Sequence, residues 1–308
     1  MCPSGYLGRR LQRKQPQLRL AENPNEWTAE HVLHAVTQFG SDLSGNLLIG
    51  DEAVRQFEKL RYSSNPLDHI PELKTAREDA EHVRPTSALG GERPKLLITT
   101  EVRAHLVKFP PRATSLAGRR WRDLLRVEAL CSQVLRSFGV SAARSKAKSG
   151  MGQMLLVVER FDRRPPRGRV GVGTFFYLAM ERWGDMGISG PEVVARLHRE
   201  GAIDPASVET CTRLHAFSAA LGNNDAHLGN YALLFDDSGR ATLAPSYDVL
   251  PMVFAPRNDE LPDQWIKPRV APIDPAVTPW VDALVRAVEA EPEISQAFKD
   301  LWRRYVGA

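Results

Sequence analysis

The spacing of apolar positions changes along the chain, and the change predicts where helices give way to strands. Residues 27–39 and 51–62 carry apolar side chains at helical spacing, and Thr28 is a suitable N-cap for the first of these segments. The preceding residues, 1–26, are polar and contain prolines, which predicts an irregular arm. Residues 61–86 are charged and interrupted by prolines, so we predict a loop-rich connection there.

Short apolar runs bounded by turn residues follow, and they predict strands at 95–99, 105–109 and 154–161. Between the last two, residues 121–138 repeat apolar side chains along one face and stop at Gly139, which predicts an amphipathic helix. The next stretch, 163–173, is rich in Pro, Arg and Gly, as expected for a boundary between lobes.

From Thr174 onward the pattern is mainly helical. The clearest predicted helices are 192–199 and 208–221, a hairpin is predicted at 231–235 and 241–243, and the tail 278–306 is helical again. The helix at 208–221 leads directly into the polar loop Gly222–Asn230. That loop is therefore predicted to follow a buried helix and precede a hairpin.

Composition fits a globular protein with room for two lobes. The chain has 308 residues, of which 43% are hydrophobic and 25% charged. No run approaches the roughly 18 apolar residues of a membrane span, and the three cysteines are scattered, which suggests neither a disulfide framework nor a zinc site. We therefore expect a cytoplasmic protein without membrane contact. The net charge of +4 is mild, and a solvated basic surface explains it better than a nucleic-acid patch.

The strongest chemical signal is the loop Gly222–Asn230. Phosphoryl transfer needs a carboxylate facing the attacking hydroxyl and oxygen ligands for magnesium. Asp225 and Asn230 lie five residues apart, as the base and the metal-ligand Asn of a protein-kinase catalytic loop do, and the hairpin returns the chain to Asp248. An Asp–Asn pair alone also fills ordinary turns. The order of helix, Asp, Asn, hairpin and second Asp is far more specific.

Two charged residues stand in apolar settings. Lys108 lies in an otherwise apolar strand, and Glu128 lies at the margin of the apolar face of the 121–138 helix. The functional interpretation is a phosphate-binding lysine held by the glutamate. The alternatives are an edge lysine with its head in water and a glutamate paired with Arg126 or another surface arginine.

Two weaker signals accompany these. Gly90-Gly91 and Lys95 allow the backbone and a positive charge to approach phosphate, although a plain turn at the start of a strand explains the glycines almost as well. His227 has no second His or Cys nearby, so a hydrogen-bonding loop residue is favoured over a zinc ligand.

Taken in order, these motifs resemble the HipA family of bacterial toxin serine/threonine kinases, and its YjjJ-type branch in particular. The resemblance covers residues 85–255 with specific motifs and the first 60 residues more loosely. The motifs that carry it are Ser87 with Gly90-Gly91 and Pro94-Lys95, Val107–Pro110, Val158–Arg163, Gly222–Asn230 and Leu243–Val249.

The resemblance implies a role for each matching position. Asp225 would be the catalytic base, and Asn230 and Asp248 would hold Mg²⁺. ATP would be bound by Lys108, the backbone of Glu159 and Phe161, Asp162 near the ribose, and His227. Glu128 would orient the lysine, and Ser87 would be the autophosphorylation site.

Three departures from the family pattern bear on these roles. Ser87 lies eight residues before Lys95, whereas the family spacing is seven, so Ala88 occupies the register of the serine. Gly229 stands where many relatives have lysine, which removes one phosphate contact. The chain is also shorter than typical members at both ends, and the missing N-terminal part is expected to have held a DNA-binding or β-rich module.

The resemblance implies an α+β fold of the two-lobed protein-kinase type, with a smaller mixed N-terminal lobe and a mostly helical C-terminal lobe. We predict an N-terminal arm and helices at 1–84, the ATP-binding lobe at 85–162 and the catalytic lobe at 163–308. The expected activity is ATP- and Mg²⁺-dependent phosphorylation of a protein on Ser or Thr, with an aminoacyl-tRNA synthetase as one substrate that the family suggests.

The expected setting is the toxin component of a type II toxin–antitoxin module. Its expected partners are a protein substrate and a cognate antitoxin, with DNA reached only through that antitoxin or a missing N-terminal module. Two alternatives stay open: a catalytically weak module that binds an antitoxin or DNA, and a small-molecule kinase on a related scaffold.

Overall fold

The computed structural model describes residues 5–59, 95–99, 103–110, 115–150, 153–165, 167–257 and 260–307. Contacts divide the chain into two compact units. The N-terminal unit comprises Met1–Phe109 and Asp162–Val172, and the C-terminal unit comprises Pro110–Phe161 and Gly173–Ala308. The sequence predicts boundaries after residues 84 and 162 instead. The division into an arm, an ATP-binding lobe and a catalytic lobe stays a prediction.

The N-terminal unit combines helices with short antiparallel ladders. Its main elements are α1 (Gly5–Lys14), α2 (Ala29–Phe39), α3 (Asp51–Lys59), β1 (Lys95–Thr99), β2 (Ala104–Lys108), β5 (Arg163–Arg164) and β6 (Gly168–Arg169). β1 pairs with β2 and β5 with β6. Thr28 caps α2 in a capping box with His31, which confirms the predicted N-cap.

The predicted irregular arm at 1–26 is wrong, because residues 5–14 form α1. This helix ends in Arg13 and Lys14, where positive charge is favourable. A small core explains why a polar segment orders: Leu18, Leu20 and Trp27 are buried together, and Leu11 packs against them. Few apolar residues suffice for so small a core, so the apolar periodicity of this segment is too weak to predict the helix.

The C-terminal unit is mostly helical. Its elements are α5 (Leu116–Ser137), β3 (Ser145–Gly150), β4 (Gln153–Glu159), α6 (Phe175–Trp183), α7 (Gly190–Arg199), α8 (Pro205–Ala220), β8 (Ala232–Phe235), β9 (Ala241–Leu243), α9 (Thr278–Ala290) and α10 (Gln296–Val306), and β7 (Gly171–Thr174) leads into α6. β3 pairs with β4 and β8 with β9, all antiparallel. Helices together with antiparallel strands confirm the predicted α+β class. Among the described residues, no helix combines the length and apolar character needed to cross a bilayer.

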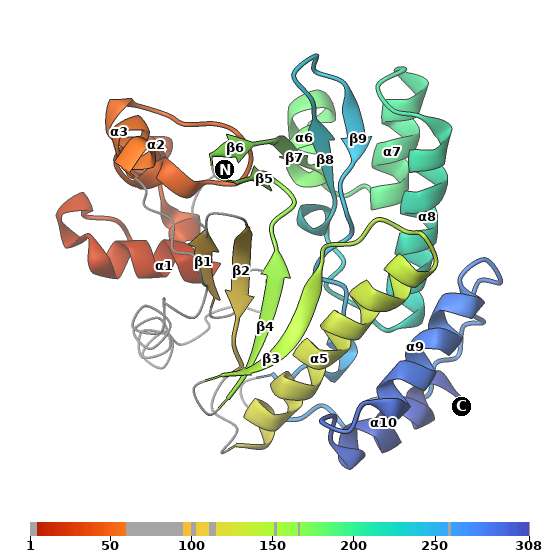
Figure 1. Cartoon of the computed structure of the whole chain (residues 1–308). Helices are drawn as coiled ribbons and strands as arrows, with labels where there is room; N and C mark the ends of the chain where they lie inside the picture. The colour runs from red at the N-terminus through yellow and green to blue at the C-terminus, as the bar shows by residue number, and fades with distance from the viewer. Residues whose placement is uncertain are drawn as a thin grey trace. The chain divides into compact units, whose positions relative to one another are not determined.

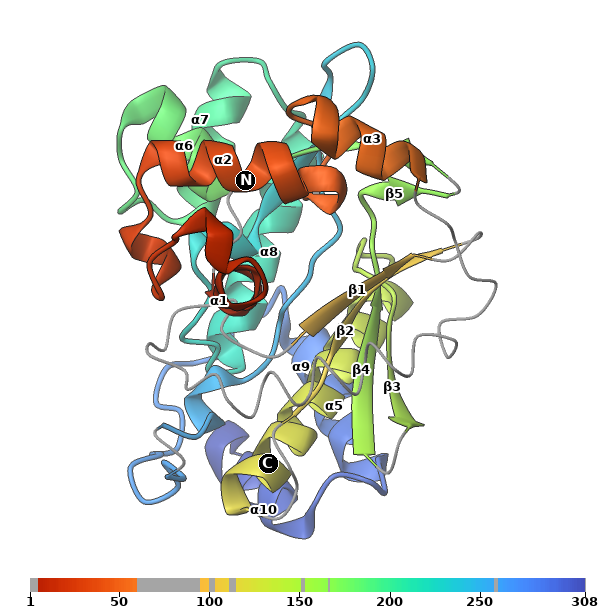
Figure 2. The ribbon, with the colours of Figure 1, turned by 90° about the vertical axis from the view of Figure 1, so that its left-hand side faces the viewer.

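Helix α5 is the central element of this unit. It lies against the β3–β4 hairpin and beside α9 (Figures 1 and 2). Its buried side chains, Leu124, Val127 and Cys131 among them, belong to one core with those of α8, α9 and α10. Ser115 caps it by accepting a hydrogen bond from the Gly118 amide, so the helix begins earlier than the predicted Trp121.

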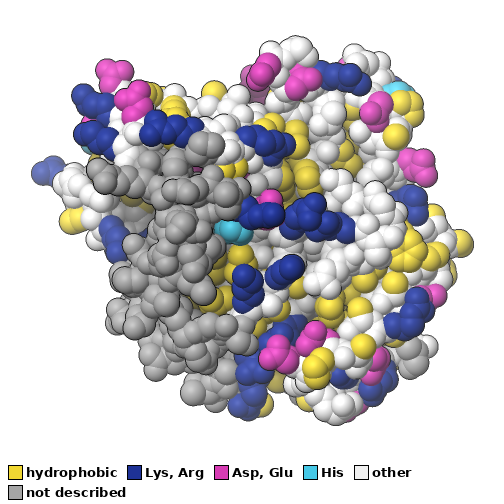
Figure 3. Space-filling model, viewed as in Figure 1, with side chains coloured by type: hydrophobic (Ala, Val, Ile, Leu, Met, Phe, Trp, Pro, Cys, Tyr) yellow, Lys and Arg dark blue, Asp and Glu magenta, His cyan; other side chains and the backbone are white. Residues whose placement is uncertain are grey.

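Strand β3 was not predicted, and its side chains explain why. Lys146 and Lys148 are exposed on one side of the strand, while Ser145 is buried on the other. Small or polar residues at the inward positions remove the apolar alternation that identifies a strand. Figure 3 shows basic side chains on the face of the molecule where β3 lies in Figure 1.

A buried ion cluster holds the N-terminal unit together. The Arg163 guanidinium donates to the Asp162 carboxylate at 2.8 Å, to Asp42 at 2.8 Å and to the Gly45 carbonyl at 2.9 Å. The Gly45 amide in turn donates to Asp162 Oδ2 at 2.9 Å. Gly45 has a φ of +79°, and a Cβ there would lie 3.2 Å from the Val172 nitrogen, so only glycine fits. Residues 42–45 are thereby fixed to the segment after β4.

We predict that Arg163→Met frees this segment, because removing the cation of a buried pair costs about 3 kcal/mol. Hydrogen exchange of the Gly45 amide should accelerate roughly a hundredfold. Arg167→Met is the matched control, because the Arg167 guanidinium is exposed and donates to the Glu58 carbonyl. Equal exchange in the two variants would show that the cluster does not hold the segment.

Helix α8 allows a test of a charged cap. The Asp204 carboxylate accepts from the Ser207 amide at 2.7 Å, and this hydrogen bond lowers the pKa of Asp204. Because the folded pKa is lowered, the cap contributes fully above the unfolded pKa of about 3.9 and is lost as pH falls through the folded value. We expect Asp204→Ala to cost about 1 kcal/mol near pH 7 and to match the parent in acid, measured by urea unfolding.

The control for this measurement is Ser189→Ala at the N-cap of α7, where the Ser189 hydroxyl accepts from the Glu192 amide. An uncharged cap should contribute equally at both pH values. A loss at Asp204 that does not change with pH would mean that the carboxylate charge is irrelevant to the cap.

Candidate functional site

The loop Gly222–Asn230 begins where α8 ends. Gly222 has a φ of +74°, and a Cβ there would lie 2.5 Å from the Tyr305 hydroxyl and 2.7 Å from Val253, so glycine is required. The Gly222 carbonyl accepts from the Val253 amide at 2.9 Å. The start of the loop is therefore fixed to the C-terminal part of its own unit.

Backbone and side-chain hydrogen bonds then lock the loop around Asp225. The Asp225 carbonyl accepts from the Asn230 Nδ2 atom at 2.9 Å and from the His227 amide at 2.9 Å. The Asp225 amide donates to Asn223 Oδ1 at 3.3 Å. Because Nδ2 of Asn230 is used in this way, its Oδ1 is the atom left to bind a cation. The structure thus joins the predicted base and the predicted metal ligand directly.

A hydrogen bond within the loop also defines the tautomer of His227. Its Nδ1 accepts from the Gly229 amide at 3.0 Å, so the proton of the neutral ring lies on Nε2. The side chain is exposed. His227 therefore presents an N–H donor at the loop surface, which suits an anionic ligand oxygen.

Asp248 is held in an unusual backbone conformation. Its φ is +58°, in the left-handed region, where a residue other than glycine costs about 1–3 kcal/mol and where Asp and Asn are tolerated best. The segment before it is fixed from outside, because the Ser246 carbonyl accepts from the Ala143 amide at 2.8 Å and the Ser246 amide donates to the Ser141 carbonyl at 2.9 Å. Strain of this kind is typical of functional positions.

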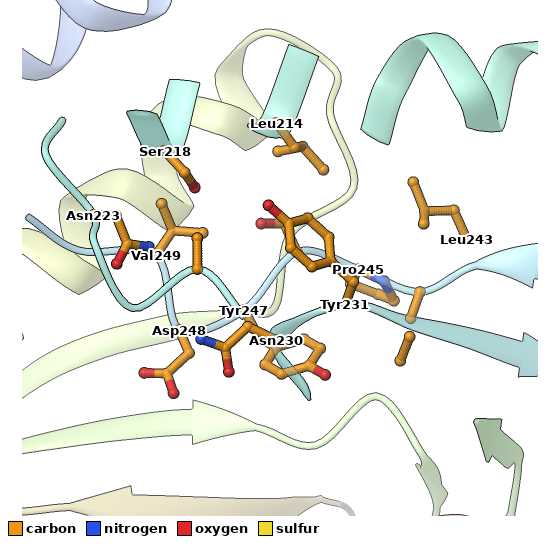
Figure 4. Close-up of a pocket in the computed structure, with 14 residues that line it drawn as sticks. Leu214, Ser218, Asn223, Asn230, Tyr231, Leu243, Pro245, Tyr247, Asp248 and Val249 are labelled. Carbon is orange, nitrogen blue, oxygen red and sulfur yellow. The ribbon is translucent and has the colours of Figure 1, made fainter. Parts of the chain in front are cut away.

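Two pockets meet at Asp248. One, of about 390 Å³ and partly open to solvent, is lined by Asn223, Asn230 and Asp248 among others, and Figure 4 shows the Asn230 and Asp248 side chains directed to the same side. The other, of about 270 Å³, is lined by Glu128, Ser145 and Asp248 among others. The C-terminal unit thus brings together Asn230, Asp248 and Glu128, with Asp225 joined to them through the Asn230 amide.

Glu128 is positioned by the anchoring of α5. Arg120, about two turns earlier on the helix, is buried and pairs with Asp263 through both carboxylate oxygens, at 2.7 and 2.8 Å. The same guanidinium donates to the Phe254 carbonyl at 3.1 Å. A bidentate pair of this type fixes the helix in position as well as in rotation.

The remaining predicted residues belong to other elements of the fold. Lys108 ends β2 in the N-terminal unit and is only 7% exposed. Asp162 belongs to the buried cluster of that unit, and its Oδ2 atom already accepts two hydrogen bonds. Glu159 and Phe161 lie at the end of β4 and just after it, in the C-terminal unit. Ser87 and Gly90-Gly91 lie outside the described residues.

Sequence reasoning missed Tyr247 as a site residue. Its ring lies 5.5 Å from the ring of Phe161, and its hydroxyl donates to the Gly229 carbonyl at 2.8 Å. Burial, and secondarily the charge of Asp248, raise the pKa of this phenol, so it stays a donor. No local pattern marks such a residue, because both partners are distant in sequence.

The donor set fits a hard cation bound with help from other ligands. In the described part of the chain, no three His, Cys, Asp or Glu side chains are close enough to form a metal cluster. Asn230 and Asp248 could offer it one amide and one carboxylate group. Magnesium is commonly held by so few protein oxygens, with water and phosphate completing its shell.

Comparisons with known proteins identify the family of the chain. Residues 87–306 match the HipA-like C-terminal domain, and residues 1–58 match the middle domain of YjjJ-like toxins. The chain is 31% identical to Toxin YjjJ of Escherichia coli (strain K12) over 317 aligned residues, which cover 97% of this chain and 70% of that protein.

One solved structure shows the same fold, and a second is reported for comparison. HipA in the toxin–antitoxin complex of Shewanella oneidensis MR-1 with HipB and operator DNA has a TM-score of 0.59 at 15% identity, over 97% of this chain and 80% of that one. The proinflammatory kinase CtkA of Helicobacter pylori has a TM-score of 0.48 at 14% identity, over 69% of this chain and 88% of that one. From its sequence matches, the chain belongs to the HipA-like family, with a YjjJ-type middle domain before its HipA-like C-terminal domain.

Proposed function

We propose that the chain is an ATP- and Mg²⁺-dependent serine/threonine protein kinase of the HipA type. The observation that carries the proposal is the arrangement around one pocket: Asn230 and Asp248 line it, and the Asn230 amide is tied to Asp225. One base and two oxygen ligands in this order are what phosphoryl transfer requires of a protein.

In this proposal Asp225 accepts the proton of the attacking Ser or Thr hydroxyl while the new O–P bond forms and the bond from the γ-phosphorus to ADP breaks. Asn230 Oδ1 and the Asp248 carboxylate hold Mg²⁺, which neutralises the charge on the phosphates when it is bound. The hydrogen bonds to the Asp225 carbonyl and amide fix the backbone that carries this carboxylate.

The nucleotide contacts are proposals of the same kind. Lys108 would contact the phosphates and Glu128 would orient it, and the backbone of Glu159 and Phe161 would bind adenine. Since Oδ2 of Asp162 accepts from Gly45 and Arg163, a ribose hydroxyl would have to donate to Oδ1. His227 would donate its Nε2 proton to a phosphate oxygen.

The biological setting is proposed from the relatives. A protein similar in fold was solved with HipB and operator DNA, and a protein similar in sequence is named a toxin. We therefore propose that this chain is a toxin that phosphorylates a cellular protein in the cytoplasm and is held in check by a cognate antitoxin, through which any contact with DNA is made.

We predict that Asp225→Asn lowers phosphoryl transfer by roughly three orders of magnitude, the middle of the range for loss of a general base. Binding of MgATP should change less than about threefold, because the carboxylate acts on the acceptor hydroxyl and not on the nucleotide. The measurement is transfer from labelled ATP to host lysate, with nucleotide affinity from calorimetry.

Asp237→Asn serves as the control, since Asp237 is exposed in the turn of the β8–β9 hairpin. It should retain both properties. Retention of full transfer by Asp225→Asn would remove Asp225 as the base, and absence of nucleotide binding by the parent would favour the alternative of a non-catalytic binding module.

A second variant isolates the metal ligand. Asn tolerates the left-handed backbone as well as Asp does, so Asp248→Asn should fold normally. It removes one charge from the proposed Mg²⁺ site. The ratio of the ATP affinity in magnesium to the ATP affinity in chelator should therefore be at least tenfold smaller than in the parent. Calorimetry with ATP in magnesium and in chelator gives this ratio. An unchanged ratio would exclude Asp248 as a ligand.

A further inference from the structure

Tyr247 is the side chain through which two parts of the C-terminal unit meet. Its ring packs against Phe161 with centroids 5.5 Å apart and planes at 41°, and its hydroxyl donates to the Gly229 carbonyl at 2.8 Å. It lines both pockets that meet at Asp248. Figure 4 shows it with Asn230 and Asp248 among the residues that line the first of these pockets.

Each contact involves a residue next to a proposed ligand-binding position. Gly229 precedes Asn230, and Tyr247 itself precedes Asp248. A shift of the Tyr247 ring therefore moves the hydrogen bond to the segment that carries Asn230 and strains the backbone that carries Asp248. The left-handed φ of Asp248 leaves little freedom for that backbone to adapt.

Both contacts are of a kind that transmits a constraint. The Gly229 carbonyl can only accept, and it loses a partly buried hydrogen bond if the phenol withdraws. The ring contact with Phe161 is tilted and within the range of favourable aromatic pairs. The ring therefore has one preferred position while Phe161 keeps its own.

We propose that Tyr247 is a specificity-determining positioning residue that makes magnesium binding at Asn230 and Asp248 depend on the base bound beside Phe161. This inference rests on the proposed function, in which the backbone at Phe161 binds adenine. A bound base restricts Phe161, Phe161 restricts Tyr247, and Tyr247 pre-orders both ligand segments before the metal complex arrives.

The test compares ATP with inorganic tripolyphosphate, which carries the phosphates without a base. For each ligand the affinity in excess magnesium is divided by the affinity in chelator. In the parent chain we expect this magnesium enhancement to be about fivefold larger for ATP than for tripolyphosphate, the size expected from one aromatic pair.

Tyr247→Phe keeps the ring and removes only the hydrogen bond to Gly229, so the fivefold difference should shrink. Phe161→Leu should reduce it as well, and the double variant should lose no more than the larger single effect, because both act through one contact chain. Tyr177→Phe is the matched control: Tyr177 is exposed and packs edge-on against Phe176 at 5.4 Å. It should behave as the parent.

The outcomes separate the two levels of the proposal. If the parent binds no ATP with magnesium, the kinase function fails. If it binds both ligands with equal magnesium enhancement, the function stands and the role of Tyr247 is refuted. The same refutation follows if Tyr247→Phe retains the full difference, and thermal unfolding of each variant shows whether a loss merely reflects misfolding.

Discussion

Burial of α5 is the constraint on which the rest of the C-terminal unit depends. One side of the helix packs into the core with α8, α9 and α10, and the Arg120–Asp263 pair fixes its position. Glu128 on the same helix lines a pocket that Asp248 also lines. A charged residue on a helix so firmly packed cannot withdraw from its pocket without disturbing the core, so packing helps to set the position of Glu128.

The segment from Ser246 to Asp248 is positioned in a comparable way, by the backbone. Hydrogen bonds to Ser141 and Ala143 fix its start, which attaches it to the chain that continues into β3. Its end must then enter the left-handed region at Asp248. Helix α5, which carries Glu128, also packs on β3. The β3–β4 hairpin therefore positions the carboxylates of both Glu128 and Asp248. This accounts for a site whose residues are spread over more than a hundred positions of sequence.

Much of this could be predicted from the sequence because it is local. Helix α8, which leads to the loop Gly222–Asn230, the β8–β9 hairpin and the Thr28 cap follow from periodicity and capping chemistry. Strand β3 could not be predicted, since its inward-facing side chains are small. Helix α1 could not be predicted either, because the core beside it holds few residues. The contacts of Tyr247 and Arg163 could not be predicted from the sequence either. They join residues far apart in sequence, and no spacing rule describes them.

Gly229 illustrates how such contacts decide a residue type. The resemblance to the HipA family predicts a lysine there, whose charge would suit the phosphates. In this chain a Cβ at 229 would lie 2.8 Å from the His227 ring, which accepts the Gly229 amide hydrogen bond, while the carbonyl of the same residue accepts from Tyr247. A side chain at 229 would displace the histidine that caps the loop. Glycine at this position therefore belongs with His227 and Tyr247 as one arrangement, and positive charge for the phosphates has to come from another element, for which Lys108 is the proposed source.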